Sequence, residues 1–395
     1  MAPEQSKRAA WKSPDFVLIA TILALLVIGL NMVYSASYVI AHNDPTYGSD
    51  SYFVIQQGER AVAGLVLLLV FQSLDYHLLR RLSVPFLVIV VALLVAVLAT
   101  HLSHSAYGAQ RWLKLGPLPT LEPSELAKLA LILYYADWLS RRREVIRDFA
   151  SGTLPFGIIT SGVCAMVVLQ PDLGTAVIIA AIALSLYFVA GADVRHLAFG
   201  LAAGVVVFSL VVLGAGYRSQ RITAFLDASK DPLGVGWNIT QAQIALGSGG
   251  LFGLGLGASR QKFYYLPNAH TDAIFAVIGE ELGYIGTVAV VALFVVLAFR
   301  GCRIAMQAPD AYGSLLATGI TFSIVIQAFI NIGVITATIP FTGVPLPCVS
   351  YGGSSLIESL ISMGILLNIS RQGKPGAILV RVGARAIPAR PMVAR

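Results

Sequence analysis

The stretch VPFLVIVVALLVAVLATHL, residues 84–102, decides the fold class, because it is an apolar block without Asp, Glu, Lys or Arg. A helix needs about 20 residues to cross the hydrocarbon core of a bilayer, and this block has that length. Similar blocks recur along the chain, which is 57% hydrophobic and 12% charged, unlike a soluble domain. They lack the sustained two-residue alternation of membrane β-strands. The sequence therefore predicts an all-α, polytopic membrane protein.

The apolar blocks predict about ten transmembrane helices. They lie near residues 16–38, 57–74, 84–102, 123–139, 154–170, 173–190, 196–216, 273–299, 313–333 and 353–370. The seventh and eighth spans are separated by a long polar segment, residues 218–272, which we expect to be a large extracytoplasmic loop. Residues 1–372 then form one integral-membrane domain, and residues 373–395, rich in Arg, Ala and Pro, form a cytoplasmic tail.

The distribution of lysine and arginine predicts the orientation, because cytoplasmic loops carry an excess of these residues. With the amino terminus inside, 18 of the 27 basic residues are cytoplasmic and eight are outside, while Lys128 lies within a span. Both termini are then cytoplasmic, and the loop 218–272 faces outward. Membrane topology therefore explains the net charge of +7, and nucleic acid is not an expected partner.

Basic residues on the outer side are not needed for topology and require another explanation. Five of them are Arg111, Arg218, Arg221, Arg260 and Lys262. One alternative is ordinary salt bridging to nearby acidic residues. The other is an anionic ligand, most simply a phosphate, held by Arg forks and Lys point charges. A lipid-borne, phosphorylated substrate would suit such a site.

Some ionisable residues lie within or between the predicted spans. Glu125 and Lys128 are three residues apart on the predicted helix 123–139 and can form an ion pair. Ionisable residues inside a bilayer usually pair or line a cavity, so a structural pair is at least as reasonable as a catalytic role. Asp172, in a turn between two spans, can cap the following helix or reach this pair.

Asp272 ends the outer loop and precedes an apolar helix that carries Glu280 and Glu281. Its ordinary role would be to cap a helix that begins at Ala273, although a carboxylate at a helix start can also face a cavity. Glu280 and Glu281 lie about two helical turns deeper. A buried acid there would raise the pKa of its neighbours, or it would be neutralised structurally.

Glycines crowd the loop from Gly247 to Gly257, which reads GSGGLFGLGLG. The run invites comparison with a dinucleotide-binding fingerprint, with Asp272 as its distant acidic residue. We reject this function, because no strand precedes the run and the loop faces outward. Glycine would instead allow the backbone to approach a bulky headgroup, or would give a bent surface segment.

Several motifs occur in a fixed order. The most specific lie between Tyr217 and Gly286 and include Gln241, the glycine run, Gln261-Lys262-Phe263, Leu266-Pro267 and His270-Thr271-Asp272. Others are Glu122-Pro123-Ser124-Glu125, Gln170-Pro171-Asp172-Leu173-Gly174 and Ser350-Tyr351-Gly352-Gly353-Ser354-Ser355. In these motifs the chain resembles the SEDS family (shape, elongation, division and sporulation) from the first span to about Gln372. The segments 259–267 and 135–139 are more similar to its division and sporulation branch (FtsW-like) than to its elongation branch (RodA-like).

The resemblance implies a peptidoglycan glycosyltransferase that polymerises lipid II, with release of undecaprenyl pyrophosphate, at the outer face of the bacterial cytoplasmic membrane and at the division septum. It makes Asp272 the general base. The implied substrate-binding residues are Arg111, Arg218, Arg221, Gln241, Arg260, Lys262 and His270. The implied polar network consists of Glu125, Lys128, Asp172, Glu280 and Glu281. Implied partners are a class B penicillin-binding protein transpeptidase and other divisome proteins. A divalent cation, Mg²⁺ or Mn²⁺, is a further expectation, although the sequence shows no metal ligands.

Inverting glycosyl transfer from a pyrophosphate donor needs one base, which removes the proton of the acceptor hydroxyl. Positive charge stabilises the diphosphate leaving group, so the second carboxylate of a glycosidase is not required. The main alternative is a transporter that flips lipid-linked precursors, since buried charges in a ten-helix bundle suit alternating access. A non-catalytic scaffold is a third possibility. The polar groups concentrate near the outer face around Asp272 rather than at the midplane, which favours the enzyme.

Overall fold

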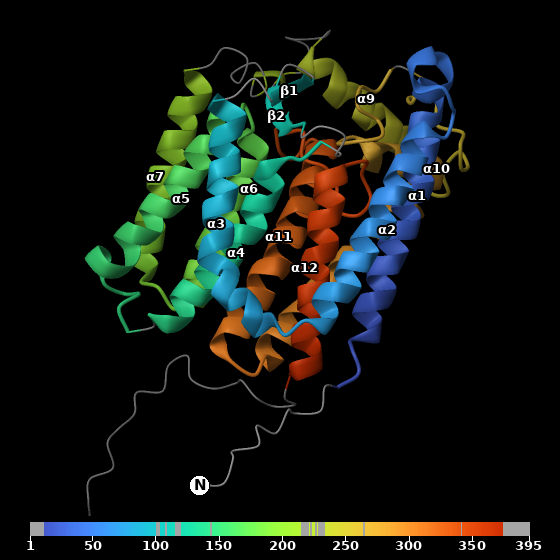
Figure 1. The fold of residues 1–395 in the computed structure, drawn as a ribbon. Coiled ribbons are helices and arrows are strands. Elements are labelled where there is room, and N and C mark those ends of the chain that lie inside the picture. The colour runs from blue at the N-terminus through green and yellow to red at the C-terminus, as the bar shows by residue number, and fades with distance from the viewer. Residues whose placement is uncertain are drawn as a thin grey trace, which may run out of the picture.

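The computed structural model describes residues 12–99, 103–106, 109–114, 120–142, 144–214, 221, 223–225, 227, 234–263, 265–340 and 342–373. In this part the chain forms a bundle of long helices (Figure 1). The long helices are α1 (Phe16–Asn43), α2 (Tyr52–Ser73), α3 (Tyr76–Ala99), α4 (Pro123–Arg141), α5 (Leu154–Leu169), α6 (Leu173–Val189), α7 (Val194–Leu213), α10 (Ile274–Gln307), α11 (Ala311–Ile335) and α12 (Gly353–Gln372).

Each of the predicted spans coincides with one of these helices. Eight helices in the described part of the chain are long and apolar enough to cross a membrane. The remaining two are α6, an apolar helix of 17 residues, and α4, in which Glu125, Lys128 and Asp137 interrupt the apolar sequence. The chain is therefore a multi-pass membrane protein, as predicted.

The centre of the bundle is formed by α11 and α12 (Figure 1). α12 packs against α2, and α11 packs against α10, α4 and α6. In the most apolar windows of α11 and α12, 67% and 72% of the residues are buried, whereas none is buried in the window of α7. The core therefore lies where α4, α11 and α12 meet, and α7 lies at the edge of the bundle.

Both ends of the described chain lie on one side of the bundle. The Lys12 N–H donates to the Arg371 carbonyl oxygen over 2.9 Å, as expected for an even number of spans. The opposite side carries a hairpin of β1 (Ser103–Ala106) and β2 (Ala109–Leu113), together with helix α9 (Val235–Ser248) (Figure 1). Neither was predicted, and α9 shows that the segment 218–272 is not loop throughout.

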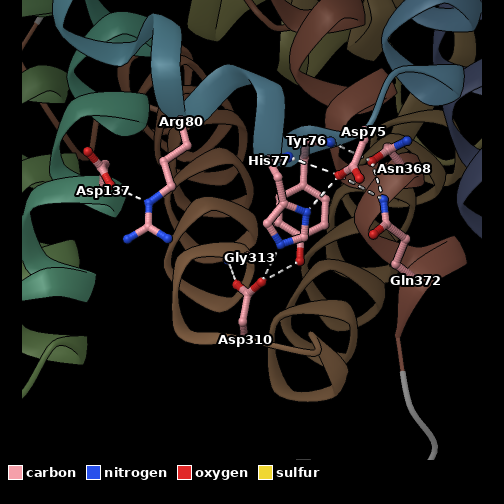
Figure 2. Close-up of polar contacts among 9 residues, drawn as sticks. All are labelled: Asp75, Tyr76, His77, Arg80, Asp137, Asp310, Gly313, Asn368 and Gln372. Carbon is pink, nitrogen blue, oxygen red and sulfur yellow. Dashed lines mark hydrogen bonds and ion pairs between the residues drawn. The ribbon is translucent and has the colours of Figure 1, made fainter. Parts of the chain in front are cut away.

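A polar cluster joins two turns on the side of the chain ends (Figure 2). The His77 ring lies between two carboxylates, with Nδ1 2.7 Å from Asp75 Oδ1 and Nε2 2.7 Å from Asp310 Oδ2. Asp310 also accepts a hydrogen bond from the Tyr76 hydroxyl over 2.9 Å and caps α11. The turn between α2 and α3 is thereby fixed to the start of α11, which helps to hold the central helix in register.

Candidate active site

Asp272 lies at the end of the bundle opposite the chain ends, in the turn that leads into α10. This helix begins at Ile274, its N-cap is Ala273, and no side chain caps it, so the expected capping role of Asp272 is wrong. The Asp272 side chain is nevertheless buried, at 8% exposure. Its Oδ1 accepts a hydrogen bond from Thr271 Oγ1 over 3.0 Å. The carboxylate therefore accepts a hydrogen bond from Thr271 but does not cap the helix.

One amide side chain fixes the backbone beside this carboxylate. Asn331 of α11 donates from Nδ2 to the Asp272 carbonyl oxygen over 2.8 Å and to the Val344 carbonyl oxygen over 2.7 Å. The segment 342–347 is thereby held against Asp272. A Cβ atom on Gly343 would lie 3.5 Å from Asp272 Oδ2. This is an ordinary contact distance, so the approach itself does not require glycine, but Gly343 has a φ of 73°, a left-handed conformation that favours glycine.

Replacing Asn331 with Leu is expected to loosen this arrangement. Two buried carbonyl oxygens would lose their donor, and each such loss costs about 1–3 kcal/mol. Asn331→Leu should therefore lower the midpoint of thermal unfolding in detergent. The control is Thr336→Val at the C-cap of the same helix, because the Thr336 hydroxyl donates to carbonyl oxygens in the last turn of α11. Equal midpoints for the two variants would contradict the role assigned to Asn331.

Burial governs the ionisation of Asp272. Loss of hydration raises the pKa of its carboxyl group to about 6, against the Thr271 hydrogen bond and the positive charge of Arg221, which both lower it. Arg221, one of the expected substrate ligands, is thus close enough to act on the carboxylate. A carboxyl group with this pKa is mostly ionised at neutral pH, yet it is a stronger base than an ordinary aspartate.

His270 and Gln241, both expected to bind substrate, are buried at 5% and 7% exposure. The centroid of the His270 ring lies 4.8 Å from that of Phe53 and 5.6 Å from that of Tyr351. Burial lowers the pKa of His270 to about 4, and its Nδ1 has no hydrogen-bond partner among the described residues. Gln241 lies on α9, which packs against α10. Both side chains are therefore buried within the protein.

Arg111 of β2 is used by the turn between α5 and α6. Its guanidinium donates to the Gln170 carbonyl oxygen over 3.3 Å and to the Pro171 carbonyl oxygen, and its Nη1 lies 3.7 Å from Asp172 Oδ1. Asp172 caps α6 by accepting from the Thr175 N–H over 3.2 Å, which confirms its capping role. These contacts argue against Arg111 as a direct substrate ligand.

Lys262 was also expected to bind substrate, but the structure encloses it at 4% exposure. Its Nζ lies 3.0 Å from Glu281 Oε1 and donates to Ser35 Oγ over 3.1 Å and to the Gly257 carbonyl oxygen over 2.7 Å. An ammonium group has three N–H donors, and these three partners use them all. Lys262 is therefore part of a buried ion pair, and these contacts argue against it as a direct substrate ligand.

Glu280 and Glu281 hold the outer loop against α10 rather than facing a substrate. Their carboxylates accept hydrogen bonds from the Ser259 hydroxyl and from the backbone N–H groups of Gly257, Ser259, Arg260 and Gln261. Ser35 Oγ also donates to Glu281. These carboxylates therefore have structural roles, and they form a cluster separate from Glu125, Lys128 and Asp172.

The glycine run fills an interruption in α10. At Gly283 the helix has φ 70° and ψ −165°. The Gly-rich segment, defined as residues 249–257, supplies the missing partners: Leu254 and Gly255 N–H donate to the Glu280 and Glu281 carbonyl oxygens, and Tyr284 and Ile285 N–H donate to those of Gly250 and Leu251. A Cβ atom on Gly253 would lie 2.1 Å from the Glu281 carbonyl oxygen. The glycines thus allow contact with a broken helix, which was neither of the two alternatives considered from the sequence, a bulky headgroup or a bent surface segment.

The predicted pair of Glu125 and Lys128 is confirmed, with Lys128 Nζ 3.0 Å from Glu125 Oε2. Lys128 also donates to Gln327 Oε1, and its Nζ lies 3.8 Å from Glu358 Oε2 of α12. Gln327 donates in turn to the Pro345 carbonyl oxygen over 3.0 Å. This buried network therefore contacts the segment 342–347 at Pro345, through Gln327. Asn331 holds the same segment at Val344, beside Asp272.

Gln327, Asn331 and Glu358 are polar residues within apolar spans, and the sequence alone assigned them no role. Their signal was the cost of placing polar groups in a membrane, which requires partners without identifying them. Arg260 is exposed, whereas Arg218 lies outside the described residues. Within the residues that the structure describes, no three His, Cys, Asp or Glu side chains are arranged to hold a metal ion.

Comparison with known proteins gives a family and close relatives. Residues 16–375 match the family FTSW_RODA_SPOVE, described as cell cycle protein. The chain is 44% identical over 363 residues to stage V sporulation protein E of Bacillus subtilis (strain 168), covering 92% of this chain and 98% of that protein. It is 43% identical over 359 residues to a probable peptidoglycan glycosyltransferase FtsW of Trichlorobacter lovleyi, covering 90% and 93%.

Solved structures share the fold. One, from a study of the structural coordination of polymerization and crosslinking by a peptidoglycan synthase complex, superposes with a TM-score of 0.74 at 28% identity, covering 91% of this chain and 98% of that one. The rod shape determining protein RodA of Thermus thermophilus superposes with a TM-score of 0.68 at 28% identity, covering 92% and 99%.

Proposed function

The chain belongs to the FTSW_RODA_SPOVE family of cell cycle proteins, and we propose that it is a peptidoglycan glycosyltransferase that polymerises lipid II at the outer face of the bacterial cytoplasmic membrane. Relatives named for this activity are 43% and 40% identical to it over 90% and 91% of its length. The observation that carries the proposal is the Asp272 carboxylate, which is buried at the outer end of a rigid bundle and has no capping duty.

Asp272 acts as the general base. Its carboxylate accepts the proton of the acceptor sugar hydroxyl as that oxygen attacks the anomeric carbon of the donor. The bond between the anomeric carbon and the diphosphate breaks, and undecaprenyl pyrophosphate leaves with the electron pair. Burial supports this role, because it raises the pKa of Asp272 to about 6. The Asn331 hydrogen bond supports it by fixing the Asp272 backbone.

The leaving diphosphate needs positive charge. Since Lys262 and Arg111 are used elsewhere, Arg221 and Arg260 are the better candidates among the described residues, and Arg218 keeps its proposed role. Arg221 is favoured because its charge already acts on Asp272. A divalent cation could enter with the donor diphosphate, but no step of the mechanism is assigned to it.

A class B penicillin-binding protein is the proposed partner, supported by the likeness to a chain from a peptidoglycan synthase complex. This partner would crosslink the strands that the chain makes. We place the pair with other divisome proteins at the division septum and both termini in the cytoplasm. Relatives named FtsW and a sporulation protein support the division and sporulation branch. The positive-inside distribution of basic residues supports the orientation.

The transporter alternative is less well supported. Discontinuous helices in transporters form a substrate site near the bilayer midplane, and α10 is interrupted at Gly283. Here, however, the Gly-rich segment fills the interruption with backbone hydrogen bonds. The Glu280 and Glu281 carboxylates also accept hydrogen bonds from backbone N–H groups of the loop. Among the described residues, the backbone groups at the break and both carboxylates are therefore engaged within the protein, which disfavours a headgroup site there.

Lipid II polymerisation in detergent tests the proposed function. The purified chain, with a partner whose transpeptidase is inactivated, should convert lipid II to long glycan, whereas the partner alone should not. Detergent removes the second compartment, so a flippase or a scaffold would make no polymer. Absence of glycan from a folded, assembled complex, with a known polymerase active in the same assay, would overturn the proposal.

A further inference from the structure

The Gly-rich segment carries large apolar side chains that the bundle does not cover. Leu251, Phe252, Leu254 and Leu256 are 63%, 79%, 40% and 69% exposed. The segment itself contains no charged residue. In an aqueous loop these side chains would form an exposed apolar patch of the kind that marks an interaction site.

Two helices place this segment at the level of the membrane. The ion pair of Asp15 and Arg300 joins α1 and α10 on the side of the chain ends. A hydrocarbon core of ~30 Å corresponds to about 20 helical residues at about 1.5 Å per residue. That distance leads from Asp15 to Ser35 on α1, and from Arg300 to Glu280 on α10. Ser35 is hydrogen-bonded to Glu281, so both helices give the same outer boundary.

The Gly-rich segment crosses this boundary. Leu254 is bonded to the Glu280 carbonyl oxygen at the boundary, whereas Gly250 and Leu251 accept from Tyr284 and Ile285, about one turn deeper. Backbone groups inside a bilayer must be satisfied within the protein. In the deeper part of the segment, the carbonyl oxygens of Gly249, Gly250 and Leu251 accept from the N–H groups of Gly253, Tyr284 and Ile285. At the boundary, the Leu254 N–H donates to the Glu280 carbonyl oxygen.

We propose that the Gly-rich segment is a re-entrant membrane anchor whose apolar side chains insert among the acyl chains of the outer leaflet. Lipid is the expected occupant because the patch continues onto the exposed side chains of a membrane-spanning helix, at Tyr284, Ile285 and Val288 of α10. The Glu280 and Glu281 carbonyl oxygens accept from the Leu254 and Gly255 N–H groups, and the Glu281 carboxylate accepts from the Gly257 N–H. These bonds fasten the segment to the helix that begins beside Asp272. The anchor therefore fixes the height of Asp272 above the hydrocarbon core.

Spin labelling of the full-length protein in phosphatidylcholine vesicles tests the anchor. The background is Cys164→Ala with Cys302→Ser, because neither thiol is fully buried. A nitroxide attached to Phe252→Cys should collide more often with oxygen, which concentrates in lipid, than with an aqueous nickel chelate. Val295→Cys on α10 is the lipid control, because Val295 is 61% exposed on a spanning helix. Thr240→Cys on the exposed side of α9 is the aqueous control.

Leu256→Cys should give the same result as Phe252→Cys, so the test does not depend on one variant folding. Nickel collision rates at both positions that match the aqueous control would place the segment in water and overturn the proposal. Low rates with both reagents would show that protein covers the patch, and would overturn it in favour of a protein interface.

Discussion

Asp272→Asn is expected to lower the rate of lipid II polymerisation by about 10²–10⁴-fold, which is the usual contribution of a general base. The amide has the size of the carboxylate and keeps an oxygen that can accept from Thr271. It cannot take up a proton at neutral pH. The measurement is the initial rate of glycan formation by the chain with its penicillin-binding protein partner, at saturating lipid II.

Asp50→Asn is the matched control. Asp50 is another acid on the outer side, paired with His42 at 47% side-chain exposure and unconnected with the proposed site, so its variant should keep the wild-type rate. Both variants should assemble with the partner. A wild-type rate for Asp272→Asn would contradict the assignment of the base. The role would then not pass readily to Glu280 or Glu281, because both accept several hydrogen bonds from the loop.

Lys262→Met is expected to destabilise the protein by about 3–5 kcal/mol, because it leaves the Glu281 carboxylate buried without its cation. The side chains of this ion pair are 3% and 0% exposed. Lys262 also joins the outer loop to α1, because its ammonium group donates to Ser35 Oγ and to the Gly257 carbonyl oxygen. Thermal unfolding of the variant in detergent should therefore occur at a clearly lower midpoint than that of the wild type.

The neighbour Arg260 supplies the control, since its side chain is exposed and a surface substitution usually changes stability by no more than about 0.5 kcal/mol. The double variant Lys262→Met with Glu281→Gln should be less destabilised than the sum of the two single variants, because it removes both charges. If Lys262→Met and Arg260→Met unfold at the same midpoint, the buried pair is not what stabilises the loop.

The membrane spans could be predicted from the sequence because the bilayer imposes a local requirement. A run of about 20 apolar residues can be recognised from the local sequence alone. Each predicted run overlaps a helix in the structure. The span of α4 could be identified despite its charges, since Glu125 and Lys128 are neighbours in one helix. A charge pair within one helical turn needs no knowledge of the rest of the fold.

The role of Lys262 could not be predicted, because its partners come from separate elements. Glu281 is 19 residues away in α10, and Ser35 is 227 residues away in α1. The prediction assumed that every basic residue on the outer side could face a ligand, whereas the Lys262 side chain is buried. The glycine run was misinterpreted for a similar reason, since its partner is an interruption of α10 that apolar composition does not reveal. Asp272 could be identified by motif, but its lack of a capping role and its attachment to Asn331 depend on tertiary contacts.

The pH dependence of polymerisation by the wild-type complex tests the central claim most directly. A general base acts only when it is deprotonated, and burial raises the pKa of Asp272 to about 6. The rate should therefore be half-maximal at about pH 6 and level off above about pH 7. Below the midpoint it should fall about tenfold for each pH unit. An ordinary aspartate, with a pKa of about 3.9, would give a constant rate between about pH 5 and 8. Such a flat profile would contradict a buried Asp272 as the base.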